Sequence, residues 1–163
     1  GYGDRFILVN TNWDLVVDTA FPVAIAKGWN LKDFNAVHIH GSRKNSDLMY
    51  LPSEVTWEPY RTAAEQQTLG GTHAAVWRAL EGAGRVVVYG LSLHPLDAEL
   101  CQTLAAGLDS GVEKEVLVIT PDHKSVAHRI NLLVNPARRI KVLGMTPDNL
   151  SLKVDHTPQR TYA

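Results

Sequence analysis

Four short groups of small polar residues follow four apolar runs of this sequence. They are Asn10-Thr11-Asn12-Trp13-Asp14, His40-Gly41-Ser42, Gly90-Leu91-Ser92 and Thr120-Pro121-Asp122. Amide, carboxylate, imidazole and hydroxyl groups orient ligands and move protons, and glycine lets a ligand approach the backbone closely. Ligands of parallel α/β sheets bind beyond the carboxyl ends of the strands. If the apolar runs are parallel strands, the four groups converge on one edge of the sheet, and that edge is the candidate site.

Several of these residues also have structural explanations. Asn12 and Asp14 suit the turn and N-cap of a following helix. His38 and His40 lie two apart on a predicted strand and would share one face, as a metal pair does, but no third ligand is evident and hydrogen-bonded histidines are the commoner case. The run 90–94 resembles the G-x-S-x-G turn of serine hydrolases, except that His94 replaces the last glycine.

The elements that must position these groups alternate between strand and helix. Strands are predicted at 6–10, 36–39, 85–90, 116–119 and 140–143, and helices at 14–26, 65–81, 96–108 and 122–133. Gly28 suits the end of the first helix, and Pro95 suits the first turn of the third. Strands that are apolar on both sides must be covered on both sides. The predicted fold class is therefore α/β, a mostly parallel sheet with helices on both faces.

Composition excludes several classes of protein. The 163 residues carry a formal net charge of -1, whereas a non-specific nucleic-acid or membrane-surface binder normally has a basic excess. A single cysteine, Cys101, excludes an intramolecular disulfide framework, and its helical position predicts a packed thiol. The longest apolar stretches are far shorter than the roughly 20 residues of a membrane span. We expect a cytoplasmic single domain over 1–163, with 144–163 as a loose tail.

Three blocks of the sequence together resemble the SIR2-like domain. They are 9–14 (Val-Asn-Thr-Asn-Trp-Asp), 37–42 (Val-His-Ile-His-Gly-Ser) and 88–100, which contains Gly90, Ser92, Leu93, Pro95 and Asp97. Their order and approximate spacing match the family, and the resemblance covers roughly residues 5 to 143. It implies a Rossmann-like sheet that binds NAD, with chemistry at the nicotinamide ribose and no metal.

The resemblance also implies roles for individual residues. Asn12 would orient a water or a ribose hydroxyl, Asp14 would hold the nicotinamide carboxamide, and His40 would be the general base, a role suited to imidazole. Cleavage of the N-glycosidic bond develops positive charge on the ribose, which a nearby carboxylate or amide dipole stabilises. The remaining cofactor contacts would come from Thr11, Gly41, Ser42, Gly90, Ser92, Leu93 and Thr120.

The chain departs from the family pattern in three places. It lacks the four-cysteine zinc module of sirtuin deacylases and has only the irregular segment 48–71, which favours the zinc-free NAD-hydrolysing branch associated with bacterial defence. The family's Gly-rich phosphate loop is not found before the first polar group, so we expect an N-terminally incomplete domain. Thr120 stands where the family often has Asn.

Two classes of function follow. One is an NAD⁺ glycohydrolase, and the alternative is a module of the same fold that binds NAD, a related nucleotide or a partner protein without turnover. A homo-oligomer or a fused or partner domain is expected, and nucleic acid and membrane are not expected as partners. The aromatic and proline-rich segment 48–71 predicts a cover over the sheet edge, or else a lid or an oligomer contact.

Overall fold

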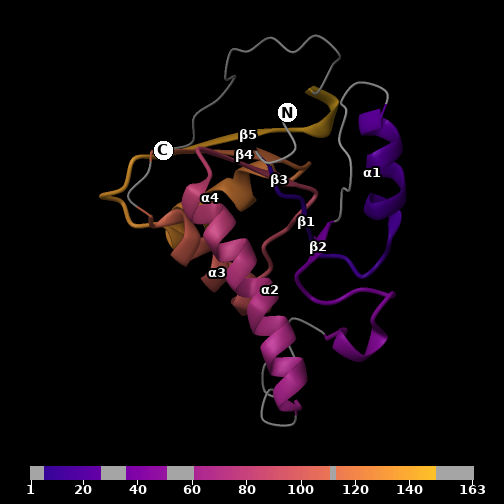
Figure 1. The fold of residues 1–163 in the computed structure, drawn as a ribbon. Coiled ribbons are helices and arrows are strands. Elements are labelled where there is room, and N and C mark those ends of the chain that lie inside the picture. Colours follow the sequence, from indigo (N-terminus) through magenta and orange to yellow (C-terminus); the bar gives the residue numbers. More distant parts are fainter. Residues whose placement is uncertain (1–5, 27–35, 51–60, 111–112, 150–163) are drawn as a thin grey trace. The chain divides into compact units, whose positions relative to one another are not determined.

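A computed structural model describes residues 6–26, 36–50, 61–110 and 113–149. The chain divides into two compact units, Gly1–Val76 and Trp77–Ala163, which we call the N-terminal and the C-terminal unit. Parallel strands and helices alternate along the chain in both units (Figure 1), so the predicted α/β class is confirmed. Among the described residues no helix combines the length and the apolar character that crossing a membrane requires.

The N-terminal unit contains a two-stranded parallel sheet. Strand β1 (Val9–Asn10) pairs with β2 (Val37–His38), so that Val9 lies opposite Val37 and Asn10 opposite His38. Helix α1 (Val16–Ala26) connects the two strands, and a 3₁₀ turn (Ser46–Leu48) follows β2. Strand β1 is shorter than the predicted 6–10, and the side chains of Phe6 and Ile7 are exposed. Because β1 and β2 are paired and parallel, their carboxyl ends lie side by side.

Helix α2 (Ala63–Gly82) begins at a capping box. The Thr62 hydroxyl accepts a hydrogen bond from the Glu65 backbone N–H at 3.3 Å. In return the Glu65 carboxylate accepts from the backbone N–H and the hydroxyl of Thr62, at 2.6 and 2.8 Å. These bonds satisfy donors that the first helical turn otherwise leaves free. They also lower the pKa of Glu65 below 4.5, with the Thr62 backbone N–H as the largest cause.

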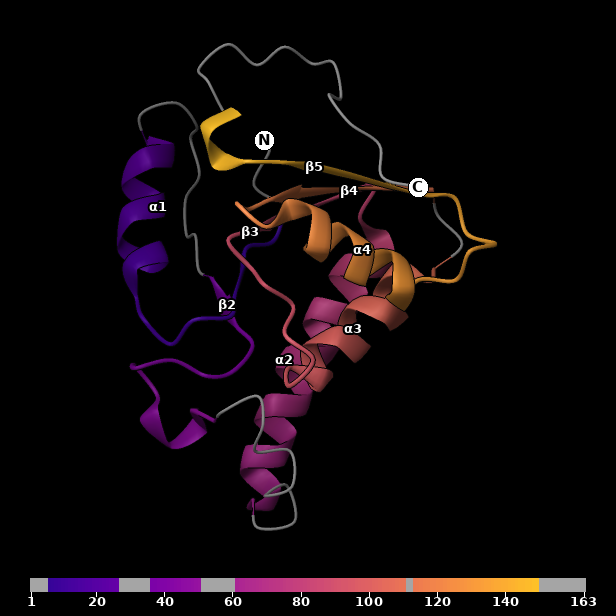
Figure 2. The same ribbon diagram turned by 180° about the vertical axis from the view of Figure 1, so that it is seen from behind.

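The C-terminal unit is built on a three-stranded parallel sheet in the order β3 (Arg85–Tyr89), β4 (Lys114–Ile119), β5 (Ile140–Met145). Helices α3 (Ala98–Leu108) and α4 (His123–Leu133) lie on the same side of these strands in both ribbon views (Figures 1 and 2). Helix α4 packs on β4 and β5, and α3 packs on α4. A second 3₁₀ turn, Pro147–Asn149, follows β5. Strand β5 runs two residues into the segment predicted as a loose tail, and residues 150–163 lie outside the described ones.

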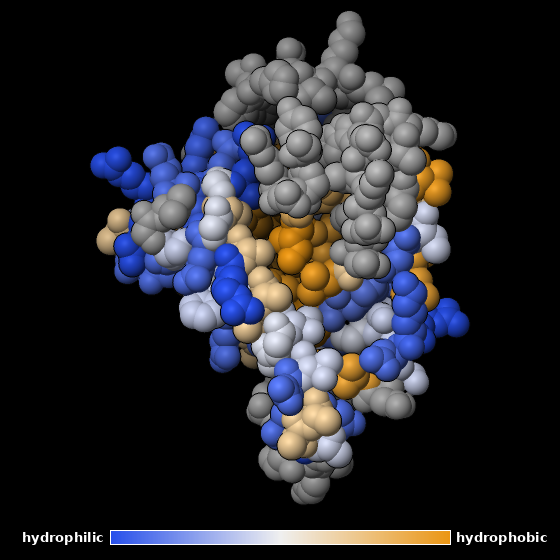
Figure 3. Space-filling model, in the orientation of Figure 1, coloured by the Kyte–Doolittle hydropathy of each residue, from blue (hydrophilic) through white to orange (hydrophobic). Residues whose placement is uncertain are grey.

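The core of this unit follows the alternation of the strands. Val116 and Val118 of β4 and Val142 of β5 are buried, and they lie with the buried apolar residues of α4. On β3, Val87 and Tyr89 alternate with Val86 and Val88 and therefore point to the other face of the sheet. Val87 is 54% exposed and Tyr89 is 67% exposed. Large apolar side chains are also exposed elsewhere, and Figure 3 shows apolar residues at the surface among mainly hydrophilic ones. At the start of the strands, Arg85 lies opposite Glu115, which in turn lies opposite Lys141.

A buried lysine closes the end of α2. The Lys114 ammonium donates to the carbonyl oxygens of Leu80, Glu81 and Ala83 at 2.7, 2.8 and 2.9 Å, and the residue is 1% exposed. The last carbonyls of a helix lack intrahelical donors and carry partial negative charge, which a cation stabilises. Burial nevertheless lowers the pKa of Lys114 below 10.5. Strand β4 begins at Lys114, two residues before the predicted start, because Lys114 and Glu115 already pair with Ile140 and Lys141 of β5.

Helices α2 and α3 approach each other closely at Gly107. A Cβ atom on Gly107 would lie 2.5 Å from the Cβ of Leu80, which is far closer than two carbon atoms pack. Both residues are buried. The glycine of α3 therefore lets the last turn of α2, which Lys114 caps, lie against α3.

Candidate functional site

The ten predicted site residues fall into two groups, one in each unit. Those of the N-terminal unit follow β1 and β2, and those of the C-terminal unit follow β3 and β4. The first group is Thr11, Asn12, Asp14, His40, Gly41 and Ser42, and the second is Gly90, Ser92, Leu93 and Thr120.

The two polar turns of the N-terminal unit start at the same edge of its sheet. Strands β1 and β2 are parallel neighbours, so Asn10 and His38 end them side by side. The backbone N–H of Arg43, in the turn after β2, donates to the carbonyl oxygen of Trp13, in the turn after β1, at 3.0 Å. The turn that carries Asn12 and the turn that follows His40 are therefore bonded to each other.

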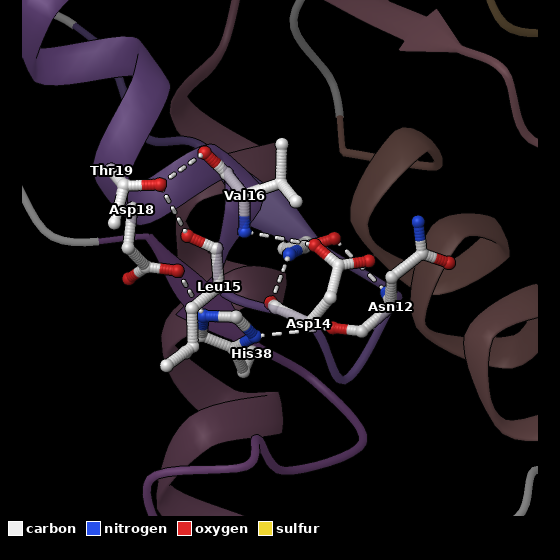
Figure 4. Close-up of polar contacts among 8 residues, drawn as sticks. Asn12, Asp14, Leu15, Val16, Asp18, Thr19 and His38 are labelled. Carbon is white, nitrogen blue, oxygen red and sulfur yellow. Dashed lines mark hydrogen bonds and ion pairs between the residues drawn. The ribbon is translucent and has the colours of Figure 1, made fainter.

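The turn after β1 is held by its own side chains (Figure 4). Asn10 is buried, and its carboxamide oxygen accepts from the Asn12 backbone N–H at 3.0 Å. One oxygen of the Asp14 carboxylate accepts from the Val16 N–H at 3.0 Å, so the predicted turn role of Asp14 at the start of α1 is confirmed. The Asn12 side chain is exposed and points away from the other labelled side chains. Thr11 is half-buried.

His40 is buried and closely surrounded. The residue is 2% exposed, and its ring packs edge-on against the ring of Tyr50, with the centroids 5.2 Å apart. The backbone is bonded on both sides of His40, because Tyr50 N–H donates to the His40 carbonyl at 3.3 Å and Ile39 N–H donates to the Asn10 carbonyl at 3.1 Å. The position of His40 is therefore set by β1 and by the chain at Tyr50.

Sequence reasoning missed the side chains that support His40. The Tyr50 hydroxyl lies 3.3 Å from the Ile39 carbonyl and 3.0 Å from Nε2 of His73, which itself lies 3.2 Å from that carbonyl. Arg61 lies over the Tyr50 ring, 4.4 Å from its centroid, as a cation–π contact. No local sequence pattern predicts this cluster, because its members come from positions 39 to 73 of the chain.

Gly41 has a structural reason to be glycine. Its φ is +78°, and a Cβ there would lie 2.4 Å from the carbonyl oxygen of Leu48 and 2.9 Å from Cα of Met49. The chain itself therefore occupies the space that the missing side chain leaves. Ser42 is buried, and its carbonyl accepts from the Asn45 N–H at 2.8 Å. The cofactor contacts predicted for Gly41 and Ser42 stay predictions.

His38 has a hydrogen-bond partner at each ring nitrogen, and strand β2 does not continue to His40. Strand β2 ends at His38, so the alternation that would place both rings on one face stops there. The two ring nitrogens of His38 lie 3.2 Å from the Asn12 carbonyl and 2.8 Å from the Asp18 carboxylate. Within the described part of the chain no group of three His, Cys, Asp or Glu residues could hold a metal ion. The hydrogen-bonded interpretation of His38 is therefore confirmed.

The C-terminal group surrounds the ends of β3 and β4. Gly90 has a φ of +64°, its N–H donates to Ile119 at 3.0 Å, and the space where a Cβ would lie is open. Thr120 is buried, and its N–H donates to the carbonyl of Met145 at 3.2 Å. The open side of Gly90 leaves a ligand room to approach the backbone.

The loop from β3 to α3 does not form a nucleophile elbow. Such an elbow places its serine on one sharp turn between strand and helix. Here α3 begins at Ala98, where Asp97 accepts from the Leu100 N–H, instead of at the predicted residue 96. Ser92 is exposed, and its carbonyl accepts from Arg129 at 2.6 Å. The left-handed backbone falls on the next residue, Leu93, with a φ of +49° and 2% exposure.

Two further expectations concern residues outside these groups. Cys101 lies half-buried on α3, and burial, the largest cause, raises the pKa of its thiol, which agrees with a packed thiol. The segment expected to form a cover or lid is described only at 48–50 and 61–71, and the prediction that it is irregular is wrong from Ala63 on, where α2 begins. Its stretch 51–60, like residues 1–5 before β1, lies outside the described residues.

Comparison of the chain with models of protein families, with curated proteins and with solved structures found no match.

Proposed function

We propose that the protein is a SIR2-like NAD⁺ glycohydrolase domain that cleaves the bond between nicotinamide and ribose. One observation carries the proposal. The turn with Asn12 and Asp14 and the turn with His40 follow two adjacent parallel strands, and the Arg43–Trp13 bond joins them. The three residue types that the resemblance assigns to catalysis are thereby on one edge of one sheet, where α/β proteins bind ligands.

Each of the three residues has a group suited to its proposed role. The exposed Asn12 carboxamide orients a water or a ribose hydroxyl. Asp14 uses one carboxylate oxygen for the Val16 N–H, which leaves the other oxygen to accept from the nicotinamide carboxamide. His40 takes the proton from the attacking water or ribose hydroxyl, while nearby dipoles stabilise the positive charge that develops on the ribose.

We propose that the C-terminal group, taken by itself, also contacts a nucleotide, as the resemblance implies. Gly90 and Ser92 follow β3, and Thr120 follows the adjacent parallel strand β4. The open space at Gly90 permits close approach of a phosphate or a ribose to the backbone. Leu93 is held in the left-handed region although it is not glycine, a costly backbone conformation of the kind that clusters at ligand sites.

The experiment is an assay of nicotinamide release from NAD by the protein and by His40→Ala. Loss of a general base lowers turnover by about 10²–10⁴-fold. His128→Ala is the matched control, because His128 is exposed on α4 and should leave turnover unchanged. Circular dichroism establishes that each variant is folded. Undiminished turnover by folded His40→Ala would refute the proposed role of His40.

A second candidate is the same fold acting as a binding module without turnover. It is favoured by the burial of His40, whose ring packs against Tyr50. This candidate predicts calorimetric binding of NAD or a related nucleotide with no nicotinamide released. Consumption of excess NAD by a substoichiometric amount of protein would exclude it. The expected self-association is tested separately, by the molar mass from light scattering with and without NAD.

A further inference from the structure

We propose that His38 is a positioning residue for Asn12, acting with Asp18 through the Asn12 backbone; the proposal rests on the proposed function. His38 is the last residue of β2, and its side chain and that of Asp18 on α1 are each 11% exposed. Nδ1 of His38 lies 3.2 Å from the Asn12 carbonyl oxygen, and Nε2 lies 2.8 Å from Oδ2 of Asp18 (Figure 4). One imidazole thus joins three segments of the N-terminal unit.

The chemistry of the partners determines where the protons lie. A carbonyl oxygen can only accept, so Nδ1 of His38 must carry a hydrogen and donate it to Asn12. Nε2 of His38 lies 2.8 Å from Oδ2 of Asp18, which accepts a hydrogen bond from this nitrogen when the nitrogen carries a hydrogen. A hydrogen bond to an ionised carboxylate is shorter and stronger than one between neutral groups.

This arrangement holds the Asn12 backbone at both its N–H and its carbonyl. Its N–H donates to the Asn10 side chain at the end of β1, and its carbonyl accepts from His38 at the end of β2. The exposed carboxamide therefore projects from a fixed backbone. A misplacement of about 1 Å at a reacting group can reduce turnover about 10²-fold. Fixing the backbone of Asn12 therefore affects the rate of the reaction more than the binding of the substrate.

The ring nitrogens can be observed directly by NMR. The histidine side-chain ¹⁵N–¹H spectrum is recorded for the protein at neutral pH, with His38→Gln used to assign the signals. The proposal predicts that Nδ1 of His38 is of the protonated type, because this nitrogen donates to the Asn12 carbonyl. An unprotonated Nδ1 in the unaltered protein would overturn the proposal.

Two conservative variants separate positioning from general stability. His38→Asn places an amide donor near the position of Nδ1 and keeps the bond to Asn12, whereas His38→Gln places it near Nε2 and keeps only the bond to Asp18. We expect His38→Gln to lower kcat for nicotinamide release 10- to 100-fold with little change in KM. His38→Asn should retain most of kcat. His128→Asn and Asp148→Asn, both exposed, are the matched controls.

The outcomes are distinguishable from those of the proposed function. Equal losses in His38→Asn and His38→Gln, or a loss seen only in KM, would overturn the positioning role. If the unaltered protein releases no nicotinamide, the proposed function fails, and the positioning of Asn12 for this reaction fails with it. In that case the NMR measurement still decides whether His38 holds the Asn12 carbonyl.

Discussion

A Cβ atom placed on Gly41 would lie 2.4 Å from the carbonyl oxygen of Leu48. The chain after β2 turns back on itself, passes over Gly41 and brings the Tyr50 N–H to the His40 carbonyl at 3.3 Å. The glycine thus allows the return of the chain that places Tyr50 against His40. The requirement for glycine here comes from the protein's own backbone and holds whether or not a ligand binds nearby.

Gly41→Ala is therefore expected to destabilise the protein strongly. The left-handed backbone alone costs an L-residue about 1–2 kcal/mol, and the collision with the Leu48 backbone adds about 1–3 kcal/mol. Gly90→Ala is the matched control, because Gly90 also has a positive φ but open space around it, so only the first cost applies. Denaturant unfolding measures both. Equal losses of stability would contradict the close approach at Gly41.

Tyr50→Phe should lower the free energy of unfolding by about 1 kcal/mol. The change removes the hydroxyl that lies between Ile39 and His73 but keeps the ring that packs on His40. Tyr89→Phe is the control, since Tyr89 is 67% exposed and its loss of a hydroxyl should change stability by less than about 0.5 kcal/mol. Thermal unfolding with calorimetry tests the pair, and identical shifts would contradict the role given to the Tyr50 hydroxyl.

Lys114→Met should destabilise the protein by about 2–4 kcal/mol, because it leaves the buried Leu80 carbonyl and the part-buried carbonyls of Glu81 and Ala83 without their donor. Lys141→Met on β5 is the control, since Lys141 is exposed and its replacement should change stability by about 0.5 kcal/mol or less. Urea unfolding of both variants provides the comparison. If Lys114→Met left the free energy of unfolding unchanged, burial of the charge would cost as much as its three hydrogen bonds contribute.

The capping box of α2 predicts a dependence on acid pH. Because the pKa of Glu65 is below 4.5 in the folded protein, the folded carboxyl keeps its charge at a lower pH than the unfolded one. Its contribution to stability is present above about pH 4.5 and is lost as pH falls through the lower folded value. The difference in melting temperature between the unaltered protein and Glu65→Ala should therefore shrink between pH 7 and pH 3.

Gln67→Ala is the control for this titration, because Gln67 is exposed on α2 and its side chain does not titrate. Its difference from the unaltered protein should stay nearly constant over the same range. A difference for Glu65→Ala that does not change with pH would show that the bonds from Thr62 do not depend on the charge of the carboxylate.

The alternation of strand and helix could be predicted from the sequence because it depends on local patterns. The run 85–90 is β-branched and apolar and became β3, and the run before Gly82 became α2. The predicted helix 65–81 begins two residues after the observed start of α2 at Ala63, although Thr62 and Glu65 have the spacing of a capping box. That signal was present in the sequence and would have placed the boundary.

Other features depend on contacts between distant positions and could not be read from a local pattern. Lys114 looks like a polar residue ahead of a strand, and only the end of α2, more than thirty residues earlier, explains its burial. His73 lies on α2 within the predicted helix 65–81, and no local pattern around it indicates that it contacts Tyr50 and Ile39. Conversely, the polar residues after β1 and β2 were found because parallel pairing places such turns at one edge by topology alone.

The charged residues across the start of the C-terminal sheet bear on how its strands align during folding. Arg85 is bonded to Glu115 at 2.8 Å, and Lys141 lies opposite Glu115 on the other side. Arg85 is largely exposed, so the pair adds only about 0–1 kcal/mol to stability. A shift of β3 by one residue would oppose Arg85 to Lys114 or Val116 and exchange the buried and exposed faces of the strand. Glu115, placed between Arg85 and Lys141, therefore acts mainly on strand register. It disfavours sheets with a shifted register more than it stabilises the correct one.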